Sequence, residues 1–460
     1  MKIFSNEPRA HIGWLLATVL RQGGDDADRV RSVLVDSING EHEVGDMGHH
    51  VISAMLNSDQ RDDWEVIAKL LLAAQRQEGL RQSILEAIDE ANPKAFQYML
   101  GVIREHDLGR FSATVRAFDA WLGMQWASGS SKVIHDGVDS LYLYFDDEEV
   151  RIQAIESAEP AEAYLALWVS AFLNAQEAIK QAEVMLVHQC AERRFVAVKM
   201  LEHLALFPES IEKMAIRLLA QEETDERVLM AMVSFIARIQ FTSVTPELFE
   251  SMGNLFNMMP KRKKKLEPII WPWAKYEYDR RVVASALKAM ASGSPDQMIP
   301  YMHALDSWDV VNLIEQLAGS GHDWVNGKTV KRKPRQLSSQ ARSAIVNLTC
   351  DSRQDVQKAA FLAIDKLTVE QDEVELLFSN LHRTAASLRQ GAIGRLSRLK
   401  DSEVIKIIDR LLGDKNTKKR AAGLELASHL VETKRSAKKV QEVVRLSEDV
   451  LTDKDQKESV

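Results

Sequence analysis

The 460-residue chain contains few cysteines, glycines and prolines. Its two cysteines, Cys190 and Cys350, are too few and too far apart for a disulfide framework or a zinc module. The 21 glycines and 11 prolines fall below the shares of about 7% and about 5% that are usual in proteins. Because these two residue types interrupt helices, their scarcity favours a largely helical chain.

Long apolar segments are missing as well. No uninterrupted apolar run approaches the roughly 18 residues that a membrane helix needs, and residues 164–173 are among the longest. The apolar stretch at residues 12–20 follows Glu7, Pro8 and Arg9, and Gly-Gly-Asp-Asp stands where a signal peptide would have its cleavage site. We therefore expect a cytoplasmic protein.

The charged residues are abundant but unevenly spread. With 45% hydrophobic and 27% charged residues, the composition is that of a chain that forms a core. Residues 1–258 hold 23 basic and 40 acidic side chains, whereas residues 259–460 hold 36 basic and 27 acidic ones. This asymmetry indicates an anionic partner at the basic end, two halves that face each other, or simply two solvated surfaces.

A helical pattern recurs in the last third of the chain. Three segments align on Leu367, Leu399 and Leu430, which are 32 and 31 positions apart. Each segment has an apolar residue three positions and another six positions before that leucine, with Ala427 as the smallest of them. Residues at this spacing lie on one face of a helix. Small residues stand seven and eight positions before the leucine, where they would let a neighbouring helix approach closely: Ala359, Ala360, Gly391, Ala392, Ala422 and Gly423.

Two upstream segments, which end at Leu204 and Ile239, fit the same template 35 positions apart. A helix pair of 31 to 35 residues cannot bury its apolar face alone, so neighbouring pairs must stack. The spacing therefore predicts an all-α fold, an α-solenoid of HEAT-like or armadillo-like helix pairs. The alternative is an irregular all-α domain with evenly spaced helices. Residues 141–145 alternate weakly like a strand but are too isolated to start a sheet.

Segments with helix-breaking residues, together with the charge distribution, divide the chain into five regions. We expect an N-terminal helical region at 1–130, acidic HEAT-like repeats at 131–258, a helical connector with basic loops at 259–340, basic HEAT-like repeats at 341–451 and a frayed tail at 452–460. The chain ends without an apolar boundary, as the front section of a longer protein would.

One segment carries a family resemblance. Residues 71–86 (LLAAQRQEGLRQSILE), Arg110-Phe111-Ser112 and Arg116-Ala117 resemble the molybdate-metabolism-regulator-like proteins, a large bacterial family of helical-repeat proteins. The resemblance covers residues 64–126 and implies HEAT-like repeats behind them, in a scaffold of a multi-protein bacterial system. Its implied partners are MoxR-type AAA+ ATPases or von Willebrand A-domain proteins. It implies no catalytic residue, and the C-terminal domain of that family is not found here.

The motifs that could carry chemistry are weak. Residues 321–329 resemble a phosphate-binding loop, but five residues separate the glycines instead of four, and residues 310–317 before them predict a helix. The adjacent His49 and His50 would point about 100° apart on a helix, which disfavours a shared metal. A Cys–His pair with Cys190 or Cys350 stays open, although buried structural cysteines are more common. We expect no enzyme, no cofactor and no metal site.

Basic clusters are the best candidates for a binding site. Cations can contact phosphates or acidic side chains, and aromatic rings can stack on unpaired bases. The candidates for an anionic partner are Lys261, Arg262, Lys263, Lys264 and Lys265 in an inter-helix loop, Lys331, Arg332, Lys333 and Arg335 in a second loop, and Lys418, Lys419 and Arg420 at a helix start. The candidates for stacking are Trp271, Trp273 and Tyr276.

Two functions follow from these patterns. The first is a non-enzymatic helical-repeat scaffold that mediates protein–protein interaction in a bacterial multi-protein system. The second is a nucleic-acid-binding solenoid that uses the basic C-terminal half as a phosphate track. Salt separates the two, because phosphate binding weakens steeply with salt and a largely apolar protein interface does not.

Overall fold

The computed structural model is all-α apart from two short hairpins among the residues that it describes. These residues are 12–39, 48–124, 131–204, 206, 208–220, 223–239, 244–291, 294–325, 328–333, 335–365, 367–381, 386–432 and 437–452. Contacts divide the chain into two compact units, and the boundary falls within helix α16 (Arg280–Met290), between Ala286 and Leu287. The prediction of an all-α chain is confirmed.

The first unit contains α-helices and one hairpin, and it ends within α16. Its α-helices are α1 (Ile12–Gln22), α2 (Gly24–Ile38), α3 (Gly48–Leu56), α4 (Arg61–Ala73), α5 (Glu78–Ala87), α6 (Pro93–Glu105), α7 (Ser112–Leu122), α8 (Ser131–Asp146), α9 (Glu148–Ile155), α10 (Pro160–Leu173), α11 (Ala175–Met185), α12 (Ala191–His203), α13 (Pro208–Ala220), α14 (Glu226–Ala237) and α15 (Pro246–Met258). Short 3-10 helices η4 (Ala74–Arg76), η5 (Ile88–Glu90) and η6 (Leu108–Arg110) join some of them, and strands β1 (Lys264–Leu266) and β2 (Tyr276–Tyr278) pair antiparallel.

The second unit also consists of helices with one hairpin. Its helices are η7 (Pro295–Ala304), α17 (Ser307–Ala318), α18 (Ser339–Leu348), α19 (Gln354–Ile364), α20 (Gln371–Asn380), α21 (Ala386–Leu396), α22 (Asp401–Leu412), α23 (Thr417–Glu432) and α24 (Ala437–Thr452). Strands β3 (His322–Val325) and β4 (Lys328–Lys331) form an antiparallel hairpin after α17. No helix in the described ranges combines the length and the apolarity needed to cross a bilayer.

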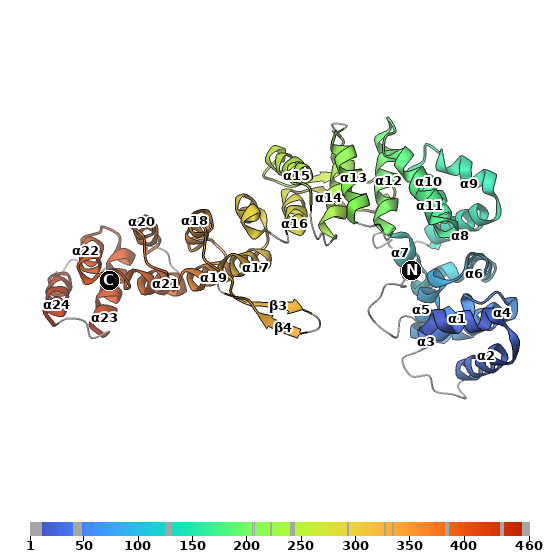
Figure 1. Cartoon of the computed structure of the whole chain (residues 1–460), viewed down its shortest axis with the longest axis horizontal. Helices are drawn as coiled ribbons and strands as arrows, with labels where there is room; N and C mark the ends of the chain where they lie inside the picture. Colours follow the sequence, from blue (N-terminus) through green and yellow to red (C-terminus); the bar gives the residue numbers. More distant parts are fainter. Residues whose placement is uncertain are drawn as a thin grey trace. The chain divides into compact units, whose positions relative to one another are not determined.

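Within each unit, helices that are two places apart in the chain stack on one another. In the first unit α3, α5 and α7 form one row, and α4, α6 and α8 form the other (Figure 1). In the second unit α17, α19, α21 and α23 follow one another, with α18, α20 and α22 along their other side (Figure 1). Two rows of alternating helices are what stacked helix pairs produce, so the predicted α-solenoid arrangement is confirmed.

Several helices begin at a polar side chain that caps them. Asn92 caps α6 by accepting a hydrogen bond from the backbone N–H of Ala95, and Pro93 occupies the first turn. The Asn92-Pro93 dipeptide therefore marks the start of α6. Asp147, Asp225, Asp306 and Ser338 cap α9, α14, α17 and α18 in the same way.

The repeated segments of the sequence coincide with α19, α21 and α23. Their aligned small residues lie against neighbours, as predicted. A Cβ atom at Gly391 of α21 would lie 2.7 Å from the ring of Phe361 in α19, and one at Gly423 of α23 would lie 2.9 Å from Cβ of Leu411 in α22. The absence of a side chain at these positions therefore sets the helix–helix distance in the second unit.

Ion pairs join elements that are about one repeat apart along the chain. The partners are 29 to 38 positions apart. The pairs are Arg31–Asp63, Arg116–Glu78, Arg104–Asp139, Arg194–Glu223 and Arg227–Glu192 in the first unit, and Arg342–Glu373, Arg410–Glu375 and Arg389–Glu425 in the second. Since each pair connects successive repeats, it helps fix how one repeat sits on the next.

Glu373 at the start of α20 is the most enclosed of these acids in the second unit. Its carboxylate accepts hydrogen bonds from Arg342 at 2.9 Å and from Arg395 at 3.0 Å. The side chains of Glu373 and Arg395 are only 4% and 2% exposed. Both arginines also donate to the carbonyl of Thr368, so the cluster holds the turn before α20.

One expectation from the sequence is wrong, and one segment with an ambiguous pattern is helical. Residues 141–145, which alternate weakly like a strand, lie inside helix α8, where Leu141 and Tyr144 are buried. The two basic segments expected as loops each contain a strand. Lys264 and Lys265 pair with β2, and residues 322–325 pair with residues 328–331 in the β3–β4 hairpin. The sequence already disfavoured a phosphate-binding loop in this part of the chain.

A pair of glycine substitutions tests close packing. Gly423→Ala should destabilise the second unit by about 1–3 kcal/mol, because its Cβ would crowd Leu411. Gly394→Ala is the control. No atom lies within 4 Å of a Cβ at position 394 in α21, so this change should stabilise the helix by about 0.5–1 kcal/mol. Urea unfolding of the full chain checks the two signs, and equal effects would contradict the packing argument.

A second pair of variants tests the buried acid. Glu373→Gln should cost about 3–5 kcal/mol, because it leaves Arg395 buried without its counter-charge. Glu375→Gln on the same helix breaks the exposed pair with Arg410 and should cost less than about 1 kcal/mol. Hydrogen exchange of the α20 and α21 amides in the full chain measures both losses. A similar cost for the two variants would show that burial of the pair is irrelevant.

Candidate functional site

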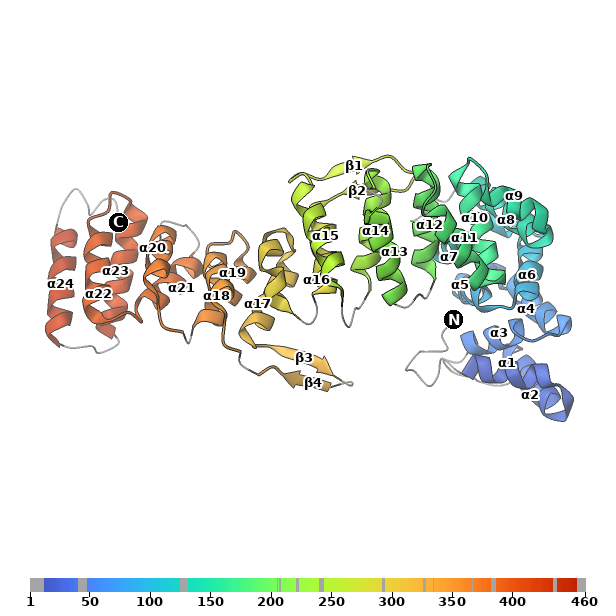
Figure 2. The same cartoon turned by 45° about the horizontal axis from the view of Figure 1, so that its top comes forward.

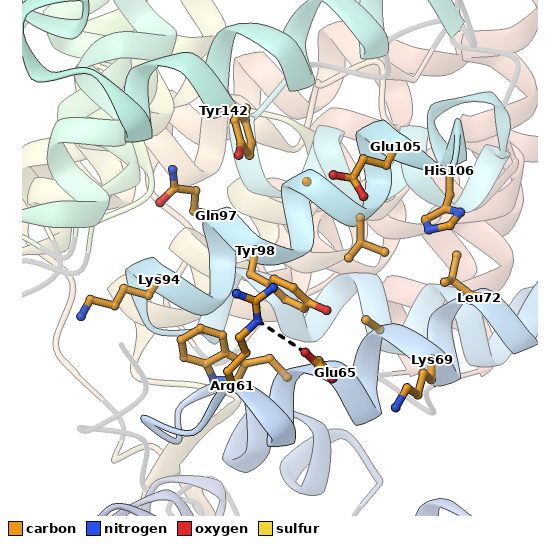
Figure 3. Close-up of a pocket in the computed structure, with 14 residues that line it drawn as sticks. Arg61, Glu65, Lys69, Leu72, Lys94, Gln97, Tyr98, Glu105, His106 and Tyr142 are labelled. Atoms are coloured by element: carbon orange, nitrogen blue, oxygen red, sulfur yellow. Dashed lines mark ion pairs between the residues drawn. The ribbon is translucent and has the colours of Figure 1, made fainter.

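A groove with a volume of about 580 Å³ lies on one row of the first unit. Helices α4 and α6 supply most of its lining, and α8 supplies Tyr142 (Figure 3). The lining residues are Arg61, Trp64, Glu65, Ala68, Lys69, Leu72, Lys94, Gln97, Tyr98, Gly101, Val102, Glu105, His106 and Tyr142. We call this surface the α4–α6 groove. Its volume falls in the range of about 300–1,000 Å³ that is typical of binding sites.

The floor of the groove is apolar and aromatic. Trp64 of α4 and Tyr98 of α6 lie 34 positions apart in the sequence, and their ring centroids are 6.1 Å apart. Gly101 hollows the floor, since it leaves only backbone beneath Tyr142. A Cβ at this position would lie 3.5 Å from Cε2 of Tyr142, at ordinary contact distance. The indole N–H of Trp64 donates to the carbonyl of Ser58, which fixes the ring.

The rim carries charges of both signs. The guanidinium of Arg61 lies 5.3 Å from the centroid of the Tyr98 ring and pairs with Glu65 at 3.4 Å, as Figure 3 shows. Lys94 lies at one end of the groove, and Lys69 and Glu105 lie toward the other (Figure 3). Next to Lys94, Gln97 donates to Asp146 of α8 at 3.3 Å.

The phenol of Tyr98 reports on these carboxylates. Partial burial raises the pKa of Tyr98, and the negative charges of Glu65 and Glu105 raise it further, while Arg61 opposes them. The negative potential of both carboxylates therefore extends to the Tyr98 ring inside the groove. The groove presents aromatic rings, cations and carboxylates, which suits recognition of a polar, partly apolar ligand.

The described residues contain no group of three or more His, Cys, Asp or Glu side chains that could hold a metal ion. His49 bonds Glu90 at 3.2 Å. Cys190 is exposed, and its thiol lies 3.1 Å from Glu192, while Nδ1 of His188 accepts the backbone N–H of Cys190. His188 is thus bound to the backbone at this position and not to the thiol.

The first basic segment lies between α15 and α16. All five of its cations are exposed, but Lys263 pairs with Glu277 at 2.9 Å and Lys264 pairs with Glu226 at 2.6 Å. In the described part of the chain, Lys261, Arg262 and Lys265 have no ion-pair partner. The hairpin that carries Lys264 and Lys265 lies near one end of α14 (Figure 2).

The other two basic clusters belong to the second unit, and all three of their arginines have structural contacts. Arg332 pairs with Glu315 and Arg335 pairs with Asp296. Arg420 is buried and donates to the carbonyls of Asp414 and Lys415, which closes the turn before α23. Lys419 pairs with Asp414. The side chains of Lys331, Lys333 and Lys418 are exposed.

The three candidate stacking residues pack against other aromatic rings; Trp271 is buried, and Trp273 and Tyr276 are half-buried. Trp271 is 6% exposed and packs edge-on against Tyr164 at 5.8 Å. Trp273 stacks on Trp271 at 5.7 Å and donates its indole N–H to the carbonyl of Met124. Tyr276 packs edge-on against Phe195 at 5.2 Å. Their placement does not support stacking on bases, because the ring faces already contact side chains of the core.

The α4–α6 groove was not predicted from the sequence. Its lining residues are spread over α4, α6 and α8, and no short motif joins them. The available signal was the spacing of Trp64 and Tyr98, which places one aromatic ring in the first half of each of two neighbouring helices of one row. This spacing of 34 resembles the 31 to 35 of the repeats further along the chain.

Comparisons with known proteins give a family but no function. A model described as a family of unknown function, DUF5724, matches residues 5–460, and no curated protein matches the chain. An engineered protein from a structural genomics consortium is 16% identical, with 91% of this chain and 99% of that chain covered and a TM-score of 0.25. The structure of She4p is 12% identical, with 99% and 78% covered and a TM-score of 0.22. TM-scores this low carry no argument, and the resemblance to molybdate-metabolism-regulator-like proteins stays a prediction.

Tyr276 offers a test of its interior placement. Its buried hydroxyl has no hydrogen-bond partner among the described residues, so Tyr276→Phe should stabilise the chain by about 1 kcal/mol. Burial, with a contribution from Glu202, raises the pKa of Tyr276 to about 12. An unfolded tyrosine ionises near pH 10, whereas Tyr276 in the folded chain keeps its proton up to about pH 12, so the free energy of unfolding falls as the pH rises from about 10 to about 12. That part of the alkaline loss should vanish in Tyr276→Phe.

Tyr164→Phe is the matched control. Its buried hydroxyl donates to the carbonyl of Leu122 at 2.9 Å, so the same substitution should destabilise by about 1 kcal/mol. Urea unfolding near neutral pH and near pH 11 measures all three proteins. A destabilised Tyr276→Phe would mean that its hydroxyl has a partner after all.

Proposed function

The chain belongs to the family of unknown function DUF5724, and we propose that it is a non-enzymatic cytoplasmic scaffold whose α4–α6 groove binds a partner protein. The single observation that carries this proposal is the lining of the groove. It combines an aromatic floor at Trp64, Tyr98 and Tyr142 with Arg61 and other charges on its rim. Aromatic residues and arginine are the types that dominate the binding energy of protein interfaces.

The way the groove is built also supports a protein partner. Its walls are two stacked helices of a repeat array, and arrays of this kind bind partners on surfaces assembled from successive repeats. The indole of Trp64 is held by its hydrogen bond to Ser58, and the guanidinium of Arg61 lies on Tyr98. Side chains that are already ordered lose little entropy on binding. An ATPase or a von Willebrand A-domain protein is the partner class to look for.

Nucleic-acid binding by the basic clusters is the second candidate. The exposed cations Lys261, Arg262, Lys265, Lys331 and Lys333 favour it, since none has an ion-pair partner in the described part of the chain. The interior placement of Trp271 and Tyr276 disfavours it. Phosphate contact would then have to provide nearly all of the affinity.

A comparative pull-down from bacterial lysate tests the proposal. The bait is the full chain, and half of each sample is treated with nuclease. Gly101→Gln should abolish recovery of the partner, because a long side chain fills the hollow below Tyr142. Gly79→Gln on α5 is the control, since its Cβ would meet no atom within 4 Å and it lies outside the groove. Both changes replace a helical glycine with a good helix former, so both should preserve folding.

The outcomes separate the two candidates. A partner protein that is recovered with and without nuclease, and is lost only with Gly101→Gln, supports the scaffold. Recovery that is equal for wild type and Gly101→Gln would exclude the α4–α6 groove as the binding surface. Nucleic acid that is recovered and then lost with nuclease would favour the second candidate.

The basic segment provides a further prediction. Reversing Lys261, Arg262 and Lys265 to Glu should leave the unfolding midpoint unchanged, because these exposed side chains have no ion-pair partner in the described ranges. If the segment contacts phosphates, nucleic-acid affinity should fall. The slope of the logarithm of the binding constant against the logarithm of the salt concentration should become less steep by about three. Lys263 and Lys264 are left unchanged, because their reversal would also break pairs with Glu277 and Glu226.

A further inference from the structure

The two walls of the α4–α6 groove run in the same direction. Arg61 of α4 and Lys94 of α6, near the amino ends of their helices, lie toward one end of the groove, and Leu72 and His106, near the carboxyl ends, lie toward the other (Figure 3). The close approach of Trp64 to Tyr98 fixes this alignment, since both residues lie in the first half of their helices. One end of the groove is therefore built from two helix amino ends and the other from two carboxyl ends.

This alignment gives the groove an electrostatic direction. Helix amino ends carry a partial positive charge and carboxyl ends a partial negative charge, each about half a unit. Lys94 is exposed at the amino end and has no ion-pair partner in the described part of the chain. Arg61, at the same end, pairs with Glu65, yet its side chain remains 71% exposed. Asp62 in the first turn of α4 and Glu65 offset part of the positive charge on the α4 side. Lys94 and the amino end of α6 thus favour a carboxylate on the α6 side of this end.

The opposite end has a different character. Glu105 is exposed in the last turn of α6, also without an ion-pair partner in the described ranges, and its charge reaches Tyr98. Lys69 lies toward this end on α4 and partly offsets Glu105. The carboxyl ends of α4 and α6 add negative potential. A cationic group is favoured at Glu105, on the α6 side of the groove.

The α6 side of the middle of the groove is apolar. Gly101 leaves a hollow between Tyr98, Val102 and Tyr142, where an inserted aliphatic or aromatic side chain would contact ring surfaces. Lys94 and Glu105 are 11 positions apart on α6, which corresponds to about 16 Å along the helix axis. Three turns of a bound helix span the same distance, and the space between two parallel helices is where the ridge of a third helix fits.

We propose that the α4–α6 groove binds an amphipathic α-helix of the partner protein in one orientation. An acidic side chain of this helix lies at Lys94, an apolar side chain fills the hollow at Gly101, and a basic side chain lies at Glu105. The proposal rests on the proposed function and adds the chemistry and the direction of the partner segment. Binding then depends on the order of charges along the segment and not on its net charge.

Selection from a displayed library of random peptides, each about three helical turns long, tests the direction. The full chain is the bait, beside the double variant Lys94→Glu with Glu105→Lys. Peptides selected by the wild type should carry apolar residues at helical spacing, with Asp or Glu toward one terminus and Lys or Arg toward the other. The double variant should select the opposite order, because its groove has the reversed direction. The same order on both baits overturns the proposal.

Affinity measurements with the best selected peptide complete the test. Lys94→Glu should weaken binding about tenfold, and a peptide with its acidic residue changed to Lys should restore it. Lys132→Glu on α8 is the control, because it makes the same charge change outside the groove and should have no effect. Equal losses for both variants would mean that net charge alone matters, which also overturns the proposal.

The proposed function can fail separately from this inference. Peptides that bind the wild type and not Gly101→Gln, yet show no charge order, would leave the groove as the binding surface and overturn only its direction. Peptides that bind wild type and Gly101→Gln equally would remove the groove as the site, and the scaffold proposal with it.

Discussion

The structure depends on one constraint, which is that no single helix pair in this chain can bury its own apolar face. Stacking on the next pair removes that face from water, at roughly 25 cal/mol for each Å² covered. Close stacking requires small residues where helices meet. Gly391 and Gly423 meet this requirement, since a Cβ at either position would collide with its neighbour. Apolar contact is non-directional, so by itself it allows one repeat to shift relative to the next. The ion pairs between repeats, such as Arg342–Glu373, add directional contacts that favour one relative position.

The same stacking also creates the surface on which we place the function. A residue that recurs in the same half of neighbouring helices forms a row along the array. Trp64 and Tyr98 form such a pair, and Gly101 interrupts the row with a hollow. Two parallel neighbouring helices have their amino ends at one end of the groove and their carboxyl ends at the other. The partial charges of the two helices therefore add at each end and give the groove an electrostatic direction. The groove therefore follows from the repeat and needs no separate domain.

Much of the fold was predictable because its cause is local and periodic. The offsets before Leu367, Leu399 and Leu430 express the packing face directly, and α19, α21 and α23 are the result. The hairpins were missed, although the alternation in Tyr276-Glu277-Tyr278 and the dipeptide Asn326-Gly327 between two short β-rich runs are strand and turn signals. The burial of Trp271 was not predictable, because it depends on Tyr164, which is more than a hundred positions away. The groove combines residues from three helices, so only the structure brings them together.

The charges show why a count from the sequence overstates the case for an anionic partner. Among the predicted cations, Lys263, Lys264, Arg332, Arg335 and Lys419 are paired with acids of the same unit, and Arg420 closes a turn. These side chains stabilise the fold, and a phosphate would have to compete with their present partners. The groove is different, because Lys94 and Glu105 face solvent at opposite ends of an apolar floor without such partners in the described ranges. A surface of both signs gains little from a uniformly charged polymer and much from a segment whose charges alternate in the matching order. That difference is the physical reason to favour a protein partner over nucleic acid.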